Sequence, residues 1–202
     1  MTRDALLFRL YTGLILLIAL AAIFAPLLTS YDPYESQIQM SLLPPSAEHY
    51  FGTDKLGRDL FTRVLYGARV SLTMTLFVVV LIAGLGTLIG VISAYVGGKV
   101  DTVIMRLADI FLAFPGIVLA IAIAGVLGGS AVNAVLALVV VGWTKYARLA
   151  RSLTLKVKQQ DYLAAAITNG TRQADMIRRH ILPNILPIII VTAALDIGAL
   201  MM

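Results

Sequence analysis

The sequence predicts an all-α membrane protein: a polytopic transmembrane helical bundle of about five spans, in a single domain over residues 1–202. Two observations predict this class. Apolar residues make up 59% of the chain and charged residues 13%, against about 25% charged residues in ordinary soluble domains. The mean hydropathy is +0.91, and the apolar residues gather in runs of about 20 or more, the length that crosses a bilayer.

Residues 10–31 form the first predicted span. They carry no charged side chain and follow a short basic start that contains Arg3 and Arg9. A cleaved signal peptide is the alternative, but its apolar core usually has only about 7–15 residues. The residues after Pro26 also make a poor cleavage site. We therefore predict a retained transmembrane helix.

The segment 32–69 is predicted to be an external loop with an interfacial helix. Within 51–72, apolar residues recur every four positions from Leu56 to Val64, which gives the segment one apolar face. This pattern is typical of an amphipathic helix that lies on a membrane surface.

Four polar residues are expected to organise this interfacial helix. Asp54 or Thr53 is placed to cap its first turn. Asp59 is placed to pair with Arg63 one turn later. The charge cluster also suits a catalytic site, but an interfacial helix with ordinary ion pairs is the favoured interpretation.

Residues 70–98 are uncharged and form the second predicted span. Gly86 and Gly90 make a G-x-x-x-G face, which Gly84 extends. Small residues at this spacing let helices approach closely in lipid, where packing drives association. We expect another helix to pack on this face.

Three more spans follow a short charged break at 99–109. Residues 110–144 are uncharged and too long for one crossing, so we predict two spans joined by a turn at 127–133. Pro115 is expected to kink the first of them or to stand at its start. Residues 181–202 form the fifth span.

Asp196 lies deep in this last apolar run. A carboxylate there costs at least about 2.5 kcal/mol on insertion scales, so it usually faces a partner or a water-filled path. We therefore expect Asp196 to line the translocation pathway or a helix–helix contact, with Met201 and Met202 as further candidates for the pathway.

The distribution of charge predicts the orientation. Residues 145–180 carry two acids and eight bases, the latter being Lys145, Arg148, Arg151, Lys156, Lys158, Arg172, Arg178 and Arg179. The segment 30–69 carries four bases and five acids. The positive-inside rule places 145–180 in the cytoplasm, and four preceding spans place the N-terminus there as well.

A polar, basic stretch at 161–183 separates the last two spans. Alanines 164–166 predict a short helix, because alanine has the highest helix propensity. Gly170 is expected to end it in a left-handed conformation, and Thr171 to cap the next helix. Pro183 is expected to mark a helix boundary. An ordinary solvated helix-turn-helix is the alternative.

This stretch resembles the cytoplasmic loop of ABC-importer permeases, whose pattern is E-A-A-x3-G-x9-I-x-L-P. The corresponding residues are Ala164, Ala165, Ala166, Gly170, His180, Leu182 and Pro183. Ala164 replaces the glutamate and His180 the isoleucine, as in the peptide/nickel branch. In that family the loop forms a coupling helix that docks into a cleft on the ATP-hydrolysing subunit. The resemblance thus implies a cytoplasmic coupling loop over 145–182.

A second motif, in the external segment, is similar to the signature G-T-D-x-x-G-R-D-x-x-S-R-x-x-x-G-x-R-x-S-L of peptide/nickel permeases. The matching residues are Gly52, Thr53, Asp54, Gly57, Arg58, Asp59, Arg63, Gly67, Arg69, Ser71 and Leu72, with Thr62 in place of the serine. The resemblance covers nearly the whole chain, and the two motifs occur in the family's order.

The resemblance implies a type I ABC-importer permease fold and a set of partners. These are a second permease subunit in a hetero-dimer, two ATP-binding subunits that hold ATP and Mg²⁺, and an extracytoplasmic substrate-binding protein. The location would be a bacterial or archaeal cytoplasmic membrane. Family members usually continue into a further span after the fifth, so we expect that this chain lacks the final span.

The resemblance leaves the substrate open between peptides and nickel. The stretch 195–198 with Met201-Met202, and the segment 143–153, look slightly more like nickel permeases. We do not expect a cofactor on this chain, an enzymatic activity or nucleic-acid binding, and we assign no metal site. The chain has no cysteine and no phosphate-binding G-x-x-x-x-G-K-[ST] loop. A passive pore or a structural membrane subunit remains the alternative function; co-purification of an ATP-binding protein would separate the two.

Overall fold

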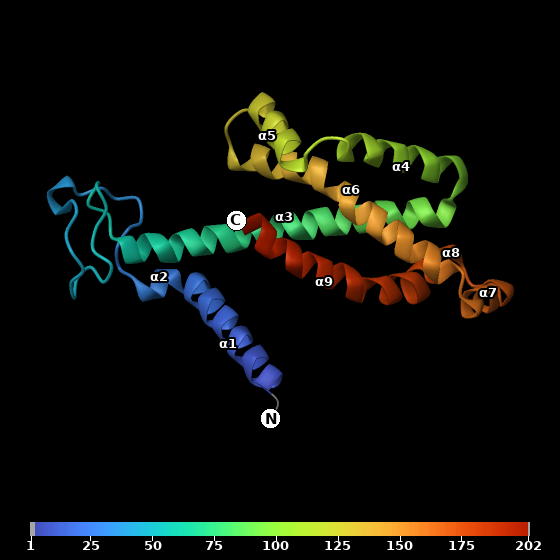
Figure 1. Cartoon of the computed structure of the whole chain (residues 1–202), viewed down its shortest axis with the longest axis horizontal. Helices are drawn as coiled ribbons and strands as arrows, with labels where there is room; N and C mark the ends of the chain where they lie inside the picture. Colours follow the sequence, from blue (N-terminus) through green and yellow to red (C-terminus); the bar gives the residue numbers. More distant parts are fainter. Residues whose placement is uncertain (1–2, 202) are drawn as a thin grey trace. The chain divides into compact units, whose positions relative to one another are not determined.

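The computed structural model describes residues 3–201, apart from the side chains of Ala164 and Ile167. Within these residues the fold is helical, with one isolated antiparallel bridge between Thr53 and Asp59 (Figure 1). This confirms the predicted all-α class. The chain divides into two compact units, Met1–Thr75 and Leu76–Met202, and helix α3 belongs partly to each.

The first unit opens with two helices. α1 (Arg3–Ile23) is long and apolar enough to cross a membrane, as predicted for this region. α2 (Ala25–Leu28) follows after Phe24, with Pro26 in its first turn, where a missing N–H costs nothing. A short 3₁₀-helix, η1 (Ile38–Met40), lies in the segment that leads to α3.

The predicted interfacial helix over 51–72 is wrong in its first part. Residues 51–59 form turns, because Gly52 and Gly57 have φ values of 74° and 73°, which end helical geometry. A Cβ at Gly57 would also overlap the backbone of Gln37. From Leu60, α3 (Leu60–Val96) continues for 37 residues, so the amphipathic part and the second span are one helix.

The second unit contains a bent pair of helices. α4 (Gly98–Leu112) and α5 (Gly116–Leu127) meet at an angle of 88°. Pro115 stands at the N-terminus of α5. Of the two predictions for this residue, a kink or a helix start, the structure thus confirms the helix start. The bend follows because the residue before a proline is pushed out of the helical region.

The charged break predicted at 99–109 is wrong, since these residues lie inside α4. The charges do not interrupt the helix because it is amphipathic. Asp101 and Asp109 point to basic residues of α6 (Ala131–Lys158) rather than into lipid. Ser130 caps α6 by accepting a hydrogen bond from the N–H of Asn133 at 3.1 Å.

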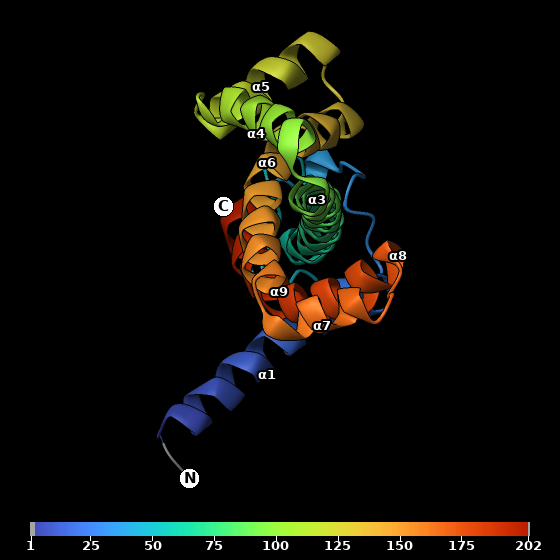
Figure 2. The same cartoon turned by 90° about the vertical axis from the view of Figure 1, so that its right-hand side faces the viewer.

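α3 and α6 pack closely through the predicted glycine face. A Cβ at Gly86 would lie 2.5 Å from the carbonyl oxygen of Trp143, and one at Gly90 would overlap the carbonyl of Ala147. Gly84 does not belong to this contact, because a Cβ there would meet nothing within 4 Å. Figure 2, which looks along α3, shows α6 beside it.

The remaining helices form the end of the chain: α7 (Asp161–Thr168), α8 (Gln173–Asp175), the π-helix η2 (Met176–Ile181) and α9 (Leu182–Met201). Helical residues run without interruption over Gln173–Met201. In the described part of the chain, four helices are long and apolar enough to span a membrane, and the bent pair makes a fifth. The number of candidate spans there is thus four, or five if the bent pair counts as one span, which is consistent with the about five predicted.

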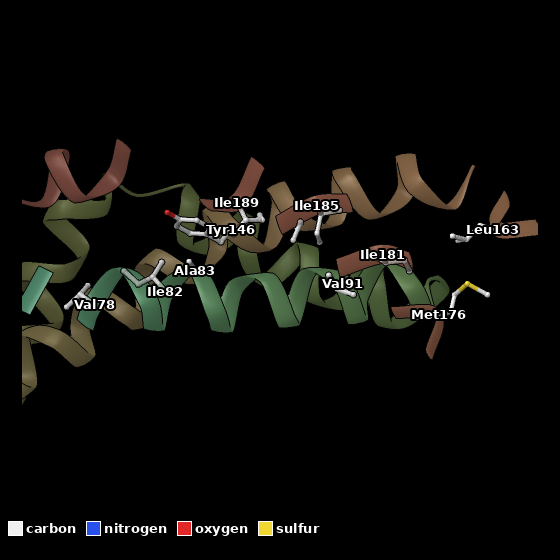
Figure 3. Close-up of a cluster of buried hydrophobic side chains, with 11 residues drawn as sticks. Val78, Ile82, Ala83, Val91, Tyr146, Leu163, Met176, Ile181, Ile185 and Ile189 are labelled. Atoms are coloured by element: carbon white, nitrogen blue, oxygen red, sulfur yellow. The ribbon is translucent and has the colours of Figure 1, made fainter. Parts of the chain in front are cut away.

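One hydrophobic core holds the second unit together (Figure 3). It combines residues of α3, α6, α7, η2 and α9, which are Val78, Ile82, Ala83, Val91, Tyr146, Ala150, Leu163, Met176, Ile181, Ile185 and Ile189. The polar stretch between the last two spans is therefore packed into the same core as the spans.

Candidate functional site

Helix α7 carries the alanines of the predicted coupling loop and confirms the short helix expected there. Its inner face is anchored by Leu163, which is 2% exposed and belongs to the core. Ala166 is half-buried, whereas Ala165 is exposed. The side chain of Ala164 lies outside the described part of the structure. The helix thus exposes Ala165 while its other side is fixed to the membrane helices.

The end of α7 is set by Gly170, whose φ of 76° confirms the predicted left-handed conformation. The N–H of Thr171 donates to the carbonyl of Ala166 at 3.1 Å, which is the hydrogen bond of a Schellman cap. The prediction that Thr171 caps the next helix is wrong. The residue before α8 is Arg172, which makes no side-chain cap, and Thr171 instead donates its backbone N–H to close α7.

The π-helix η2 joins this loop to α9. Pro183 lies in the first turn of α9, so it lacks the N–H that would bond the carbonyl of Arg179, and its ring crowds that carbonyl. A wider π turn just before it accommodates both effects. Leu182, which is half-buried, and the exposed Pro183 therefore stand at a helix junction, as predicted.

Asn184 connects this junction to α7. Its Nδ2 donates to the carbonyl of His180 at 2.6 Å and to the hydroxyl of Tyr162 at 3.2 Å. The rings of Tyr162 and His180 also lie 6.3 Å apart. Besides the core contact of Leu163, α7 thus has a polar link to the start of α9.

Asp196 contacts α6 rather than standing alone in an apolar helix. Its Oδ1 accepts from Lys145 Nζ at 2.6 Å and its Oδ2 from the Tyr146 hydroxyl at 2.8 Å. Tyr146 is 1% exposed. This satisfies the expected helix–helix contact for Asp196. Met201 is exposed, and Met202 lies outside the described residues.

Three other basic residues of α6 also bind neighbouring helices. Arg151 donates twice to Asp101 of α4, each time at 2.6 Å, and Ser93 donates to the same carboxylate at 2.6 Å. Arg148 pairs with Asp109. Lys158 donates to the carbonyls of Ala94 and Tyr95 at 3.0 and 3.1 Å.

These contacts fix α6 to α3, α4 and α9. Lys158 lies at the C-terminal end of α3, where a cation is favoured by the helix dipole. A bidentate pair such as Arg151–Asp101 fixes the relative orientation of the two side chains and also stabilises the contact between α6 and α4.

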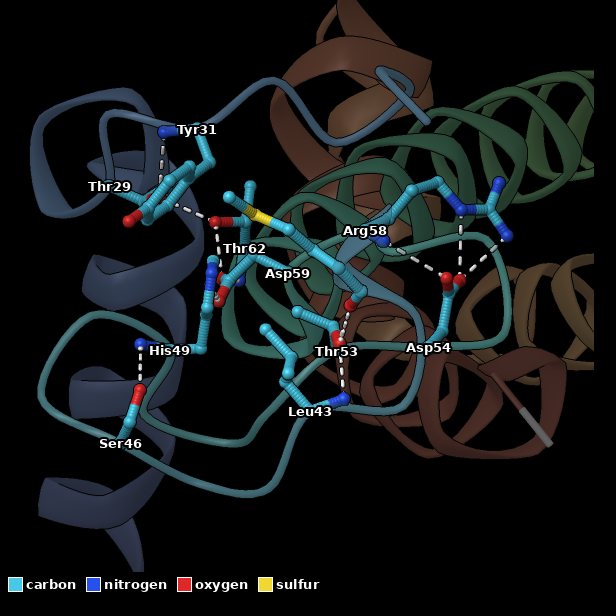
Figure 4. A network of polar contacts seen from close by, with 11 residues as sticks. Thr29, Tyr31, Leu43, Ser46, His49, Thr53, Asp54, Arg58, Asp59 and Thr62 are labelled. Carbon is cyan, nitrogen blue, oxygen red and sulfur yellow. Dashed lines mark hydrogen bonds and ion pairs between the residues drawn. The ribbon is translucent and has the colours of Figure 1, made fainter. Parts of the chain in front are cut away.

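In the first unit, the external motif forms a compact polar network (Figure 4). Asp54 accepts hydrogen bonds from the N–H groups of Leu56 and Arg58 and from the Arg58 guanidinium. The Arg58 side chain, aided by these N–H groups, lowers the pKa of Asp54 from 3.8 to about 2. Asp54 therefore caps the 51–59 turn, and its predicted role as a helix cap is wrong.

Asp59 has the capping role instead. Its Oδ2 accepts from the backbone N–H and the hydroxyl of Thr62, both at 2.7 Å, at the start of α3. Its Oδ1 lies 3.0 Å from Nδ1 of the buried His49. Burial alone would raise the pKa of Asp59, but hydrogen bonds from Thr62 and His49 outweigh it and leave that pKa below its usual value.

The other predicted contacts of this motif are also corrected. Arg63 pairs with Asp54 at 3.5 Å and not with Asp59. Thr53 is buried and bonds the backbone of Met40 and Leu43, so it does not cap a helix. In residues 3–201, no group of three or more His, Cys, Asp or Glu side chains has the arrangement of a metal site.

Sequence comparison adds to this geometry. Residues 86–202 match the family described as binding-protein-dependent transport system inner membrane component. The chain belongs to this family. In addition, residues 12–45 of the chain match the N-terminal TM domain of oligopeptide transport permease C.

Among curated relatives, the chain is 46% identical over 186 residues to the probable D,D-dipeptide transport system permease protein of Escherichia coli (strain K12). It is also 46% identical, over 188 residues, to the dipeptide transport system permease protein of Alkalihalophilus pseudofirmus. Each alignment covers 92% of this chain and 62% of the relative. The nickel transport system permease protein of Escherichia coli (strain K12) is 36% identical over 194 residues, which are 96% of this chain and 70% of that protein.

Several residues of these polar contacts were not predicted from the sequence. Asn184 and Ser93 gave no signal, because single polar residues in apolar helices are common. The pairing of Arg148 and Arg151 with Asp109 and Asp101 had a detectable signal. Arg148 and Arg151 are three residues apart on one face of α6, and Asp101 and Asp109 are eight residues apart on one face of α4.

Proposed function

We propose that this chain is the permease subunit of an ATP-driven importer and that α7 docks on an ATP-binding partner subunit. The observation that carries the proposal is the two-sided setting of α7. Ala165 faces outward from a helix whose Leu163 is buried in the core of the membrane helices. Small side chains let a partner groove approach the helix backbone closely. Leu163, on the buried side, would pass a displacement of α7 to the core of the membrane helices.

The proposed assembly follows from this role. It consists of a second permease subunit, two ATP-binding subunits that hold ATP and Mg²⁺, and an extracytoplasmic substrate-binding protein. Residues 159–182 and the N-terminus lie in the cytoplasm, and 32–69 lie outside. Residues 145–158, predicted as part of the cytoplasmic loop, continue α6, which is long and apolar enough to span a membrane. The excess of basic residues over 145–180 supports this orientation.

In the proposed mechanism, closure of the ATP-binding subunits displaces α7. The displacement reaches the core through Leu163 and reaches α9 through the Tyr162–Asn184 hydrogen bond. Asp196, farther along α9, then moves relative to Lys145 of α6. Coupling requires that these contacts differ in free energy between the outward-open and inward-open states.

We propose a peptide as the substrate. Two relatives with 46% identity are named for dipeptides, whereas the nickel relative has 36% identity. Nickel, or a nickel complex, is the second candidate, favoured by the stretch 195–198 and the segment 143–153. Uptake of labelled dipeptide and of ⁶³Ni by cells that express the complete transporter separates the two.

The coupling role is tested with Ala165→Arg and Gly170→Val in the assembled transporter. The arginine holds the partner groove away from α7. The valine strains a left-handed position, at a cost of roughly 1–2 kcal/mol or more for a β-branched residue. Both variants should insert normally but should lose association with the ATP-binding subunit and substrate-stimulated ATP hydrolysis in proteoliposomes.

Ser152→Arg is the matched control, because it adds the same side chain at an exposed position of α6, outside helix α7. It should keep both activities. Wild-type association and hydrolysis in Ala165→Arg and Gly170→Val would remove the coupling role and would favour a passive pore.

A further inference from the structure

A cavity of about 340 Å³ lies in the first unit, between the segment after α2 and the first turns of α3. Its walls are Pro33, Tyr34, Arg58, Arg63, Tyr66, Gly67, Val70 and Ser71. This volume is in the range of small-ligand sites, which is about 300–1,000 Å³. The proposed transport function assigns no role to it.

The cavity has the chemistry of an oxyanion site. Two guanidinium groups line it, and within residues 3–201 the structure pairs both with a single acid, Asp54, so one positive charge remains uncompensated there. Asp54 binds Arg58 at 2.8 and 2.9 Å and thereby fixes the direction of its planar fork. Guanidinium forks bind phosphate oxygens with matched geometry, and Tyr34, Tyr66 and Ser71 place hydroxyl-bearing side chains around them.

The position of the cavity along α3 indicates where the anion comes from. After Arg69 the sequence carries no charge up to residue 98, and Val70 and Ser71 at the start of this uncharged run form part of the wall. Helix α3 has 37 residues, so at about 1.5 Å per residue it is about 55 Å long. The hydrocarbon core of a bilayer is only about 30 Å thick. The first turns of α3 therefore extend into the headgroup region.

We propose that this cavity binds the phosphate of an anionic phospholipid headgroup, held by Arg58 and Arg63, with the acyl chains leaving along Val70. The bound lipid fastens the external turns to the start of α3. A free phosphate, which shares the headgroup's chemistry but lacks acyl chains, should bind far more weakly.

Gly67 allows the cavity to be closed without removing a charge. A Cβ at this position meets nothing within 4 Å, and the residue lines the cavity, so Gly67→Leu fills the space in which the headgroup lies. Arg63→Gln is the second variant. Its ion pair with Asp54 is long, at 3.5 Å, and half-exposed, so its loss leaves the fold intact. Lys55→Gln, at an exposed position outside the cavity, controls for lost charge.

The test measures thermal unfolding of the full chain in detergent while phosphatidylglycerol is added. Wild type and Lys55→Gln should gain stability with the same half-saturating concentration. Gly67→Leu and Arg63→Gln should unfold as wild type does without lipid and should need about tenfold more lipid, the equivalent of losing one charge-assisted contact.

Three outcomes would overturn the proposal. An equal lipid response in all four proteins would show that the lipid acts elsewhere. A response to glycerol 3-phosphate as strong as that to the lipid would assign the cavity to a free phosphate. A response to a dipeptide that Gly67→Leu abolishes would assign it to a substrate carboxylate.

Discussion

At the scale of single residues, the contacts of Asp196 explain how a carboxylate is accommodated in an apolar helix. Both oxygens are used, one by Lys145 and one by Tyr146. An acid and a base in two different spans thereby neutralise each other. Asp196→Leu should therefore reduce both assembly and uptake, because it leaves the Lys145 ammonium without its partner.

A double-mutant cycle measures this pair. Asp196→Leu and Lys145→Met should each lower stability, and the double variant should recover part of the loss. We expect a coupling free energy of about 1–2 kcal/mol, between the values of exposed and buried pairs, since the Lys145 side chain is 55% exposed and that of Asp196 20%. Unchanged uptake and unfolding temperature in Asp196→Leu would refute a role for this contact.

Asp54 gives the turns at 51–59 a defined dependence on pH. Its pKa is about 2 in the folded chain against 3.8 without the fold. A lowered pKa stabilises the folded state fully above 3.8, and the contribution disappears as pH falls towards 2. Amide protection of residues 41–62, corrected for intrinsic exchange, should fall over this range.

Asp54→Asn is the matched variant for this prediction. It should have weaker protection at neutral pH and a smaller further loss in acid, with the remaining loss due to Asp59, whose pKa is also lowered. Parallel acid curves for wild type and Asp54→Asn would contradict the role given to this carboxylate.

At the scale of helices, the contact between α3 and α6 depends on the absence of side chains. Gly90→Ala places a Cβ against the carbonyl of Ala147, and overpacking of this kind costs about 1–3 kcal/mol. Gly84→Ala, on the same helix, places its Cβ in open space and should stabilise the helix by about 0.5–1 kcal/mol. Thermal unfolding in detergent should thus shift in opposite directions. A shift of both variants in the same direction would contradict the packing.

The sequence predicted the elements whose cause is local. The glycine spacing at Gly86 and Gly90 and the left-handed Gly170 are properties of short segments, and the structure confirms them. The boundary between 51–59 and α3 depends on tertiary contacts. Gly52 and Gly57 turn the chain against Leu43 and Gln37, which are distant in sequence. Local periodicity therefore extended the helix too far.

Tertiary contacts also explain why the charged break at 99–109 was predicted wrongly and why Asn184, next to η2, was missed. Lys99, Asp101 and Asp109 interrupt an apolar run, and only the basic residues of α6 reveal that two of them lie on a covered face. The π turn depends on Pro183 in combination with the side chain of Asn184. The π turn has no one-dimensional signature, whereas the charges of α4 and α6 recur at helical spacing, a signal that the charged-break interpretation did not use.

At the scale of the whole molecule, the orientation in the membrane is open to direct measurement. The chain contains no cysteine, so single cysteines can be introduced at the exposed positions Ser46 and Thr168 without other changes. An impermeant thiol reagent applied to intact cells should label position 46 and should label position 168 only after lysis. Labelling at 168 and not at 46 would reverse the orientation.

The proposed transport role depends on one contact beyond this chain, that of α7 with an ATP-binding subunit. A photo-crosslinking residue at Ala165, in the complete transporter, tests this contact directly. Val126, at the end of α5 and 89% exposed, is the matched control position. We predict a crosslinked product with the ATP-binding subunit from position 165 and none from position 126. No product from 165, or equal products from both positions, would contradict the assignment of α7 as the coupling helix.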